Sequence, residues 1–134
     1  MSHYFTDNRD LDSSLSEFDY DFGDQKFKFK TDKGVFSKKG VDYGSYLLLN
    51  EIADLDLGND VLDLGCGYGV IGIILKKLHP AQRICLVDVN SRAVDLAKVN
   101  SEINKVDIDV YKTDDINTLN LTFDSIVLNP PIRA

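Results

Sequence analysis

Tryptophan is absent from the sequence, and methionine, histidine, cysteine and proline are scarce, with one, two, two and three residues respectively. Two cysteines, Cys66 and Cys85, are too few for a disulfide framework, so we expect both to be reduced, and we expect no metal site. No apolar run approaches the roughly 20 residues that span a bilayer. The first residues also lack the basic and apolar regions of a secretory signal. These absences predict a cytoplasmic protein with no membrane partner.

Basic residues are also fewer than acidic ones, with 15 lysines and arginines against 22 aspartates and glutamates. The net charge is −7 and the sequence pI is about 4.6, which argues against a protein that binds nucleic acid through a broad basic surface. The charges are unevenly distributed, because residues 7–24 are rich in aspartate whereas lysines crowd residues 26–39. We interpret this pattern as a solvated acidic segment beside a lysine-faced hairpin. A small phosphate-facing patch, with Lys26, Lys28 and Lys38, is the alternative.

The lysine-rich segment has the alternation of a strand. Residues 25–30 alternate phenylalanine with lysine, which predicts that Phe27 and Phe29 face inward and the lysines outward. Turn-forming residues follow at 31–34, and a second apolar run covers 35–37. The sequence therefore predicts a β-hairpin over residues 25–37.

The length of 134 residues allows one domain. Residues 1–24 are polar, acidic and without clear periodicity, so we expect a flexible N-terminal segment before a domain at 25–134. After the hairpin, Asp42 or Ser45 is placed to cap a helix that ends before Gly58.

From residue 60 onward, strand-like and helix-like segments alternate. Alternation of this kind predicts an α/β fold with parallel strands and crossover helices. The strands are nearly continuous apolar runs, which favours helices on both faces of the sheet. The segments are 61–64, 70–78, 83–87, 92–103, 106–110 and 123–128.

A glycine-rich loop, Asp63-Leu64-Gly65-Cys66-Gly67-Tyr68-Gly69, follows the first of these strands. Its glycines allow a tight turn and leave backbone N–H groups close to a ligand before the helix begins near Val70. Asp88 ends the next strand, at a spacing suited to two ribose hydroxyls. A dinucleotide-binding loop would have glycine at position 70, and it would place pyrophosphate near Asp63, whereas that carboxylate suits an ammonium group better.

Residues 61–69 and 86–90 resemble the first two motifs of class I S-adenosylmethionine-dependent methyltransferases. The resemblance implies S-adenosyl-L-methionine as the cofactor. Residues 112–115 are similar to the acidic turn of the same enzymes, in which a carboxylate, here Asp114, accepts a hydrogen bond from the adenine amino group. The resemblance implies cofactor contacts from Asp63, Gly65, Cys66, Gly67, Gly69, Asp88, Val89, Asp114 and Asp115.

Residues 124–132 resemble the fourth-motif strand and turn of amino-group methyltransferases. The Asn129 side chain offers an acceptor and donors, and the Pro130 carbonyl adds a second acceptor, so the pair can hold both hydrogens of a planar amine. Pro131 and Ile132 provide an apolar surface for a flat base. Asn129, Pro130, Pro131 and Ile132 are therefore the predicted catalytic residues.

Ordered motifs before the glycine loop, at residues 34–37, 41–45 and 47–49, narrow the resemblance. They are similar to those of bacterial small-subunit ribosomal RNA guanine-N2 methyltransferases and their short single-domain relatives, over about residues 26–134. The resemblance implies a Rossmann-like fold, methylation of guanine N2, and ribosomal RNA or the small ribosomal subunit as partner. In that group the segment before the loop helps close over the cofactor, which implies roles for Phe36, Ser37, Asp42 and Gly44.

The family sheet has seven strands in the order 3-2-1-4-5-7-6, whereas four parallel strands are found here. We therefore expect a domain truncated at its C-terminus, with sheet order 3-2-1-4 and with residues 126–128 as an uncovered edge that favours a homo-oligomer. Two alternatives stay open. One is an amino-group methyltransferase that acts on a protein glutamine or a small molecule, and the other is a catalytically inactive cofactor-binding or assembly fragment.

Overall fold

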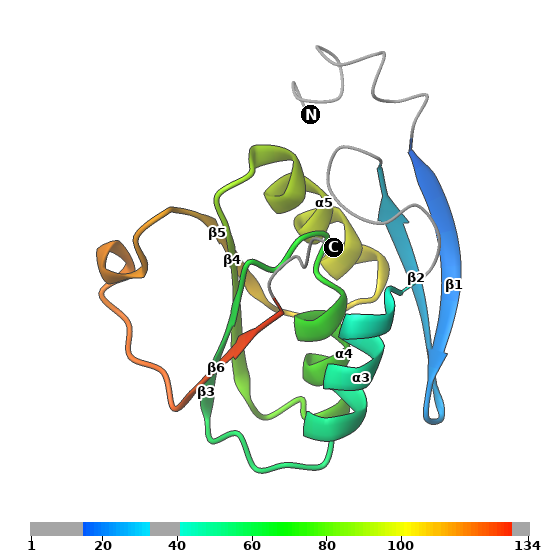
Figure 1. The fold of residues 1–134 in the computed structure, drawn as a ribbon, viewed down its shortest axis with the longest axis horizontal. Coiled ribbons are helices and arrows are strands. Elements are labelled where there is room, and N and C mark those ends of the chain that lie inside the picture. Colours follow the sequence, from blue (N-terminus) through cyan, green and yellow to red (C-terminus); the bar gives the residue numbers. More distant parts are fainter. Residues whose placement is uncertain (1–14, 33–40, 130–134) are drawn as a thin grey trace.

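The computed structural model describes residues 15–32 and 41–129 of the chain (Figure 1). In these ranges it contains an antiparallel hairpin, three α-helices, one 3-10 helix and a four-stranded parallel sheet. The predicted α/β fold class is confirmed. The elements are β1 Ser16–Phe22, β2 Gln25–Thr31, α3 Tyr43–Ile52, β3 Asp60–Leu64, α4 Val70–Leu78, β4 Arg83–Asp88, α5 Ser91–Ile103, β5 Asp109–Lys112, η1 Ile116–Leu119 and β6 Ser125–Leu128.

The parallel sheet has the strand order β5-β4-β3-β6, which is the predicted order 3-2-1-4. β3 lies at the centre, with β4 on one side and β6 on the other. Because all four strands are parallel, their carboxyl ends meet at one edge of the sheet. The third strand begins three residues later than the sequence predicted, at Asp109.

The two faces of the sheet are covered differently. On one face, Val61, Ile84 and Leu86 are buried in a core with residues of α3, α4 and α5. On the other face, Leu62, Cys85 and Val87 are covered by side chains of η1 and its flanking loops: Ile116, Leu119 and Phe123. The expectation of helices on both faces is therefore wrong for the described residues. The strands bury apolar residues on both faces, as predicted, but a short 3-10 connection covers the second face (Figure 1).

The hairpin of the described residues is formed by a strand that precedes β2, whereas the predicted partner strand, residues 35–37, lies outside the described ranges. β2 pairs with β1, which precedes it, through a turn in which Gly23 has φ +58°; residues 33–40 lie outside the described ranges. Part of the segment predicted to be flexible is thus a strand. The register explains the error, because each acidic residue of β1 faces a lysine of β2: Glu17 with Lys30, Asp19 with Lys28 and Asp21 with Lys26. The acidic run is half of a charge-complementary sheet.

Phe27 and Phe29 face inward as predicted, with 3% and 0% of their surface exposed. They belong to the core shared with the central helices, and the rings of Phe18 and Phe29 lie 5.8 Å apart. The apolar face of the hairpin therefore packs against the domain, while the charged face lies outside.

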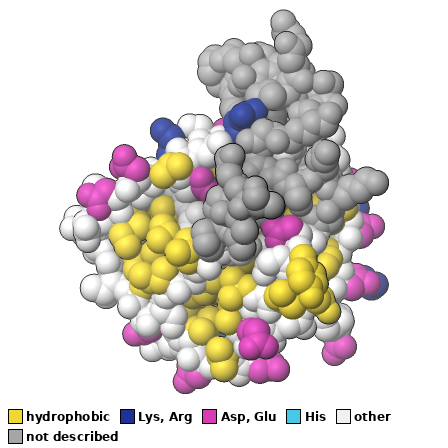
Figure 2. Space-filling view, in the orientation of Figure 1, with side chains coloured by type: hydrophobic (Ala, Val, Ile, Leu, Met, Phe, Trp, Pro, Cys, Tyr) yellow, Lys and Arg dark blue, Asp and Glu magenta, His cyan; other side chains and the backbone are white. Residues whose placement is uncertain are grey.

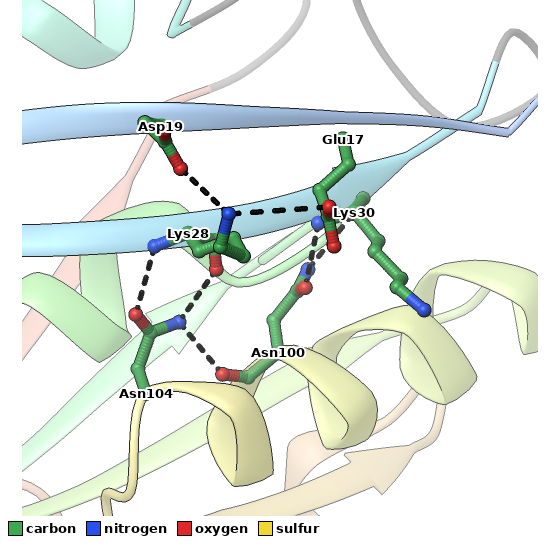
Figure 3. A network of polar contacts seen from close by, with 6 residues as sticks. All are labelled: Glu17, Asp19, Lys28, Lys30, Asn100 and Asn104. Atoms are coloured by element: carbon green, nitrogen blue, oxygen red, sulfur yellow. Dashed lines mark hydrogen bonds and ion pairs between the residues drawn. The ribbon is translucent and has the colours of Figure 1, made fainter.

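Two asparagines, Asn100 of α5 and Asn104 at its C-cap, attach the hairpin to the domain (Figure 3). Asn104 Oδ1 accepts a hydrogen bond from the Lys28 N–H, and Asn104 Nδ2 donates to the Lys28 carbonyl, at 3.0 and 2.9 Å. One turn earlier, Asn100 makes the same pair of bonds with the main chain of Lys30, at 2.8 and 2.9 Å. The side-chain amides thus satisfy the free edge of β2 as a neighbouring strand would. Asn100 also donates to the carbonyl of Tyr68 in the glycine loop, at 2.8 Å.

Replacing Asn100 by alanine is expected to destabilise the fold by about 2–4 kcal/mol, because buried main-chain groups that lose their partners cost roughly 1–3 kcal/mol each. Urea unfolding followed by circular dichroism measures this difference. The exposed Asn117 of η1 is the control position, and Asn117→Ala should change stability by less than about 0.5 kcal/mol. Equal effects of the two substitutions would contradict the assigned role of Asn100.

Candidate functional site at the carboxyl edge of the sheet

The predicted site residues follow the ends of three neighbouring strands. β3 leads into the glycine loop, β4 ends at Asp88, and β6 ends one residue before Asn129. Since the carboxyl ends of parallel strands share one edge, these segments meet although they are far apart in sequence. The sheet order alone therefore brings together the loop, Asp88 and Asn129.

The backbone of the glycine loop has the conformation that glycine favours. Gly65, Gly67 and Gly69 have φ values of +73°, +57° and +100°, a region that other residues rarely adopt. The N–H groups of Gly65 and Cys66 both donate to the Val87 carbonyl, at 2.8 and 3.0 Å, which fixes the loop to β4. A Cβ atom added at Gly65 would have no atom within 4 Å, so the loop borders open space at this position.

Asp63 lies beneath the loop and is buried, with 3% of its surface exposed. Its Oδ2 atom accepts a hydrogen bond from the Gly72 N–H at 3.1 Å, in the first turn of α4. Burial raises the pKa of Asp63 from its ordinary value of 3.8 to about 7, with a smaller contribution from the charge of Asp88, while the Gly72 bond acts in the opposite direction. A buried carboxylate of this kind favours a cationic partner.

The raised pKa of Asp63 predicts a dependence of stability on pH. The folded state holds this proton more tightly than the unfolded state, so the stabilisation is complete below about pH 4 and is lost as pH rises to about 7. The slope in this window is at most about 1.4 kcal/mol per pH unit. Urea unfolding at pH 5, 6 and 7 should show a shallower decline for Asp63→Asn than for the wild type. Parallel curves for the two proteins would contradict the prediction.

Asp88 is held by two backbone amides. Its Oδ2 atom accepts from the Gly67 N–H and its Oδ1 atom from the Asn90 N–H, both at 2.9 Å. Asn90 in turn caps α5, because its side chain accepts from the N–H groups of Arg92 and Ala93. Each carboxylate oxygen of Asp88 keeps a further lone pair for a ligand. The carboxylate is therefore oriented before any ligand binds.

Asn129 contacts the first turn of α3. Its Nδ2 atom donates to Ser45 Oγ at 2.9 Å, and Ser45 is buried. A Cβ atom at Gly44 would lie 3.1 Å from Asn129 Oδ1. The side chain of Asp42 caps the helix by accepting from the Ser45 N–H at 2.7 Å, so Asp42 is the cap of the two candidates in the sequence. The start of α3 thus fixes the side-chain amide of Asn129.

A small cavity joins the loop to Asn129. Its volume is about 20 Å³, which is room for a group of about the size of one water molecule. The lining residues come from α3, β3, the glycine loop, α4 and the end of β6: Ser45, Asp63, Gly65, Cys66, Gly67, Tyr68, Val70, Ile71 and Asn129. Burial raises the pKa of the Cys66 thiol in this wall.

Three other residues predicted to contact the cofactor, Val89, Asp114 and Asp115, do not line this cavity. Asp114 and Val89 are exposed, and Thr113, next to Asp114, donates its N–H to the Asp88 carbonyl at 3.1 Å. Asp115 caps η1 by accepting from the Asn117 N–H at 3.0 Å, which is a local structural contact. The predicted residues that lie outside the described ranges are Phe36, Ser37, Pro130, Pro131 and Ile132.

Sequence reasoning missed Tyr68 and Asn100. The Tyr68 ring is buried against Phe18 and Phe29, at ring distances of 6.1 and 5.9 Å, so the hairpin packs directly on the glycine loop. Burial is the main cause that raises the pKa of the Tyr68 hydroxyl. The signal for Asn100 was available, because it falls on the same helix face as the buried Leu96 and Ala97.

The comparison with protein families tests the predicted resemblance to methyltransferases. Residues 26–134 match the family model described as the methyltransferase small domain. The chain belongs to the methyltransferase small domain family. Family and fold together confirm the predicted resemblance to class I S-adenosylmethionine-dependent methyltransferases. Among the described residues, no helix is long and apolar enough to cross a membrane.

The relatives of this chain match different shares of their own length. The protein YbxB of Bacillus subtilis (strain 168), described as uncharacterized, is 38% identical over 135 residues, which are 98% of this chain and 67% of that protein. Ribosomal RNA small subunit methyltransferase C of Pseudomonas aeruginosa (strain UCBPP-PA14) is 35% identical over 124 residues, which are 92% of this chain but 37% of that protein. The chain thus spans about two thirds of the first relative and little more than a third of the second.

Two solved structures resemble the fold. The T. thermophilus 16S rRNA N2 G1207 methyltransferase (RsmC), solved in complex with AdoMet and guanosine, has a TM-score of 0.77 at 28% identity, over 89% of this chain and 33% of that chain. The Pyrococcus abyssi tRNA (uracil-54, C5)-methyltransferase, in complex with S-adenosyl-L-homocysteine, has a TM-score of 0.67 at 25% identity, over 86% and 28% of the chains. Both neighbours support the predicted S-adenosylmethionine cofactor.

Proposed function

We propose that the chain binds S-adenosylmethionine at the carboxyl edge of the sheet and transfers its methyl group to an exocyclic amine, the N2 atom of a guanine in small-subunit ribosomal RNA. One observation carries the proposal: Asp63, the glycine loop and Asn129 line a single cavity. The predicted cofactor site and the predicted catalytic residue are thus adjacent. Separate sites for the two would have excluded group transfer.

The residues present fit the cofactor. The buried Asp63 carboxylate suits the ammonium of its amino-acid end, and the oriented Asp88 carboxylate suits two ribose hydroxyls. Gly65 and Gly67 allow a ligand to approach the backbone closely. When bound, S-adenosylmethionine supplies an electrophilic methyl group.

The side-chain amide of Asn129 is oriented so that it can accept a hydrogen bond from an amine. Because its Nδ2 atom donates to Ser45 Oγ, the orientation of the amide is set and Oδ1 remains an acceptor for an amine hydrogen. The absence of a side chain at Gly44 keeps the space beside Oδ1 free, since a Cβ atom there would lie 3.1 Å from it. An amine held through its hydrogens has its lone pair directed away from them, so this arrangement orients the nucleophile.

The relatives support the substrate class, and the charge of the chain limits how an RNA substrate is recognised. The P. aeruginosa relative and the T. thermophilus neighbour are both named for methylation of small-subunit ribosomal RNA. The predicted phosphate contacts of the hairpin are weakened, because Lys28 lies 2.9 Å from Asp19 and Lys26 lies 3.7 Å from Asp21. With a net charge of −7, we infer that recognition depends on an unstacked base more than on the phosphate backbone.

Transfer of a labelled methyl group from S-adenosylmethionine tests the proposal. Small ribosomal subunits and protein-free ribosomal RNA are offered separately, and label is expected on N2 of guanine after nuclease digestion. Label found on ribosomal protein would instead support a protein glutamine as the acceptor. No transfer to either substrate by a chain that binds S-adenosylhomocysteine would refute the proposed reaction for this chain.

A further inference from the structure

A single side chain, that of Asn100, joins the hairpin to the glycine loop. It is buried, with 0% of its surface exposed. Its Oδ1 atom accepts from the Lys30 N–H at 2.8 Å, and its Nδ2 atom donates to the Lys30 carbonyl at 2.9 Å (Figure 3). The other Nδ2 hydrogen is donated to the Tyr68 carbonyl at 2.8 Å. One planar amide therefore connects the edge of β2 to the loop, and both of its donors are used.

The Tyr68 carbonyl belongs to the peptide group between Tyr68 and Gly69, and this group is held at both polar atoms. Asn100 donates to the oxygen, while the Gly69 N–H donates to a carbonyl within the loop at 3.0 Å. Because the peptide group is planar, these two bonds fix its orientation. Two residues earlier, the Gly67 N–H donates to Asp88 Oδ2 at 2.9 Å. Asn100 thus acts on the short stretch of backbone that orients the proposed ribose acceptor.

The ring of Tyr68 is packed against the same hairpin. It is buried, with its centroid 6.1 Å from that of Phe18 in β1 and 5.9 Å from that of Phe29 in β2. Figure 2 shows acidic and basic side chains along the edge of the molecule that the hairpin forms. The attachment of the hairpin therefore depends on its inner face, where Tyr68 lies. The loop meets the hairpin both through this ring and, by way of Asn100, through its backbone.

Helix α5 is packed closely on the loop, which makes it a rigid support for Asn100. A Cβ atom at Gly69 would lie 3.3 Å from the Cβ atom of Ala97, which is tighter than ordinary van der Waals contact. Ala97 and Asn100 are three residues apart in the helix and lie on the same face. The helix thus touches the loop at Ala97 and donates to it one turn later, at Asn100.

We propose that Asn100 is a positioning residue for the S-adenosylmethionine site, which it couples to docking of the β1–β2 hairpin. The inference rests on the proposed function and extends it to a residue outside the cavity, since none of the described residues that line the cavity comes from the hairpin or from α5. Coupling of this kind is reciprocal. Docking of the hairpin favours the loop conformation that binds the cofactor, and the bound cofactor favours docking of the hairpin.

Asn104 offers a matched control for Asn100. Its side chain also makes three hydrogen bonds, two of them with the main chain of β2, but the third is donated to the Asn100 carbonyl at 2.8 Å and not to the loop. Asn100→Ala is expected to weaken binding of S-adenosylhomocysteine about tenfold, measured by calorimetry on folded protein. Asn104→Ala loses as many hydrogen bonds and should bind within about threefold of the wild type.

A second pair of variants leaves these hydrogen bonds in place and decides the question if Asn100→Ala fails to fold. Phe18→Leu keeps an apolar side chain in β1 but removes the ring that packs on Tyr68. It is expected to weaken binding of S-adenosylhomocysteine about three- to tenfold. Phe22→Leu, at the end of the same strand and also packed against the core, should bind as the wild type does.

Hydrogen exchange measures the coupling from the side of the hairpin. The Lys28 N–H is bonded to Asn104, so it reports on docking in the wild type and in Asn100→Ala alike. Saturating S-adenosylhomocysteine is expected to slow its exchange about tenfold more than that of the β5 amides in the wild type. In Asn100→Ala this difference should disappear, whereas a purely structural role of Asn100 would leave it unchanged.

The outcomes separate the positioning role from the proposed function. Equal affinities of Asn100→Ala and Asn104→Ala, or of the two phenylalanine variants, would overturn the inference and leave the cofactor site in place. Absence of binding by the folded wild type would instead refute the proposed cofactor, and the positioning role with it. Asp88→Ala is the reference for that second case, because it should lose binding while the Lys28 N–H keeps its wild-type exchange rate without ligand.

Discussion

Replacing Asn129 by alanine is expected to lower kcat for methyl transfer by about 10²- to 10³-fold, the usual effect of removing one positioned polar group from an active site. The amide is fixed by Ser45, so its loss removes an acceptor that is already oriented toward the amine. Affinity for S-adenosylhomocysteine should change little, because the carboxylates proposed to hold the cofactor, Asp63 and Asp88, remain. Single-turnover transfer of labelled methyl to small subunits measures the rate, and calorimetry measures the affinity.

Two further variants separate positioning from chemistry. Ser45→Ala removes the hydroxyl that orients the amide and should lower kcat by a smaller factor, about tenfold, with the Asn129 acceptor still present. Asn117→Ala, at an exposed position of η1, should leave the rate unchanged. A rate for Asn129→Ala equal to that of the wild type would exclude Asn129 from the reaction.

Replacing Asp88 by alanine is expected to weaken binding of S-adenosylhomocysteine at least about 100-fold. The reason is the loss of two charge-assisted hydrogen bonds, each worth roughly 1.5–3 kcal/mol, where 1.4 kcal/mol corresponds to a factor of ten. The same carboxylate also holds the Gly67 N–H and the Asn90 N–H, so the loop itself should become less ordered. Isothermal titration calorimetry of the purified chain gives the affinity directly.

Asp88→Asn distinguishes the loss of the charge-assisted bonds to the ribose from the loss of order in the glycine loop. It retains one oxygen for the backbone amides but loses the charge, so its affinity should lie between those of the wild type and the alanine variant. Asp109→Ala is the matched control, because this exposed aspartate begins β5 at the opposite end of the sheet. Undiminished binding by a folded Asp88→Ala protein would exclude the proposed ribose contact.

The parallel sheet and the candidate site were largely predictable from local sequence. Apolar runs bounded by glycine and aspartate identify β3 and β4, and strand ends in a parallel sheet must share one edge. Asp63 is the last residue but one of β3, Asp88 ends β4, and Asn129 follows β6. Their convergence in space therefore follows from the strand order, which the resemblance to the family supplied.

The hairpin and its attachment were harder to predict, because they depend on contacts between distant segments. The acidic residues of β1 suggest a solvated chain until the lysines of β2 are placed opposite them. The role of Asn100 depends on a strand edge 70 residues earlier in the sequence. Contacts between distant segments leave only a weak pattern in the local sequence. The pattern here consists of the alternating charges of the two strands and the position of Asn100 on the buried face of α5.

The asparagine contacts of α5 also constrain the order of folding. The bonds between Lys28 and Asn104, and between Lys30 and Asn100, close chain segments of 76 and 70 residues. Contacts between such distant residues carry a high loop-closure entropy and tend to form late. Because Asn100 also donates to the Tyr68 carbonyl, one side chain links the hairpin to the glycine loop, and we expect the loop to be fully ordered only after the hairpin docks. We therefore expect competence to bind the cofactor to be acquired late in folding, after the central sheet has formed.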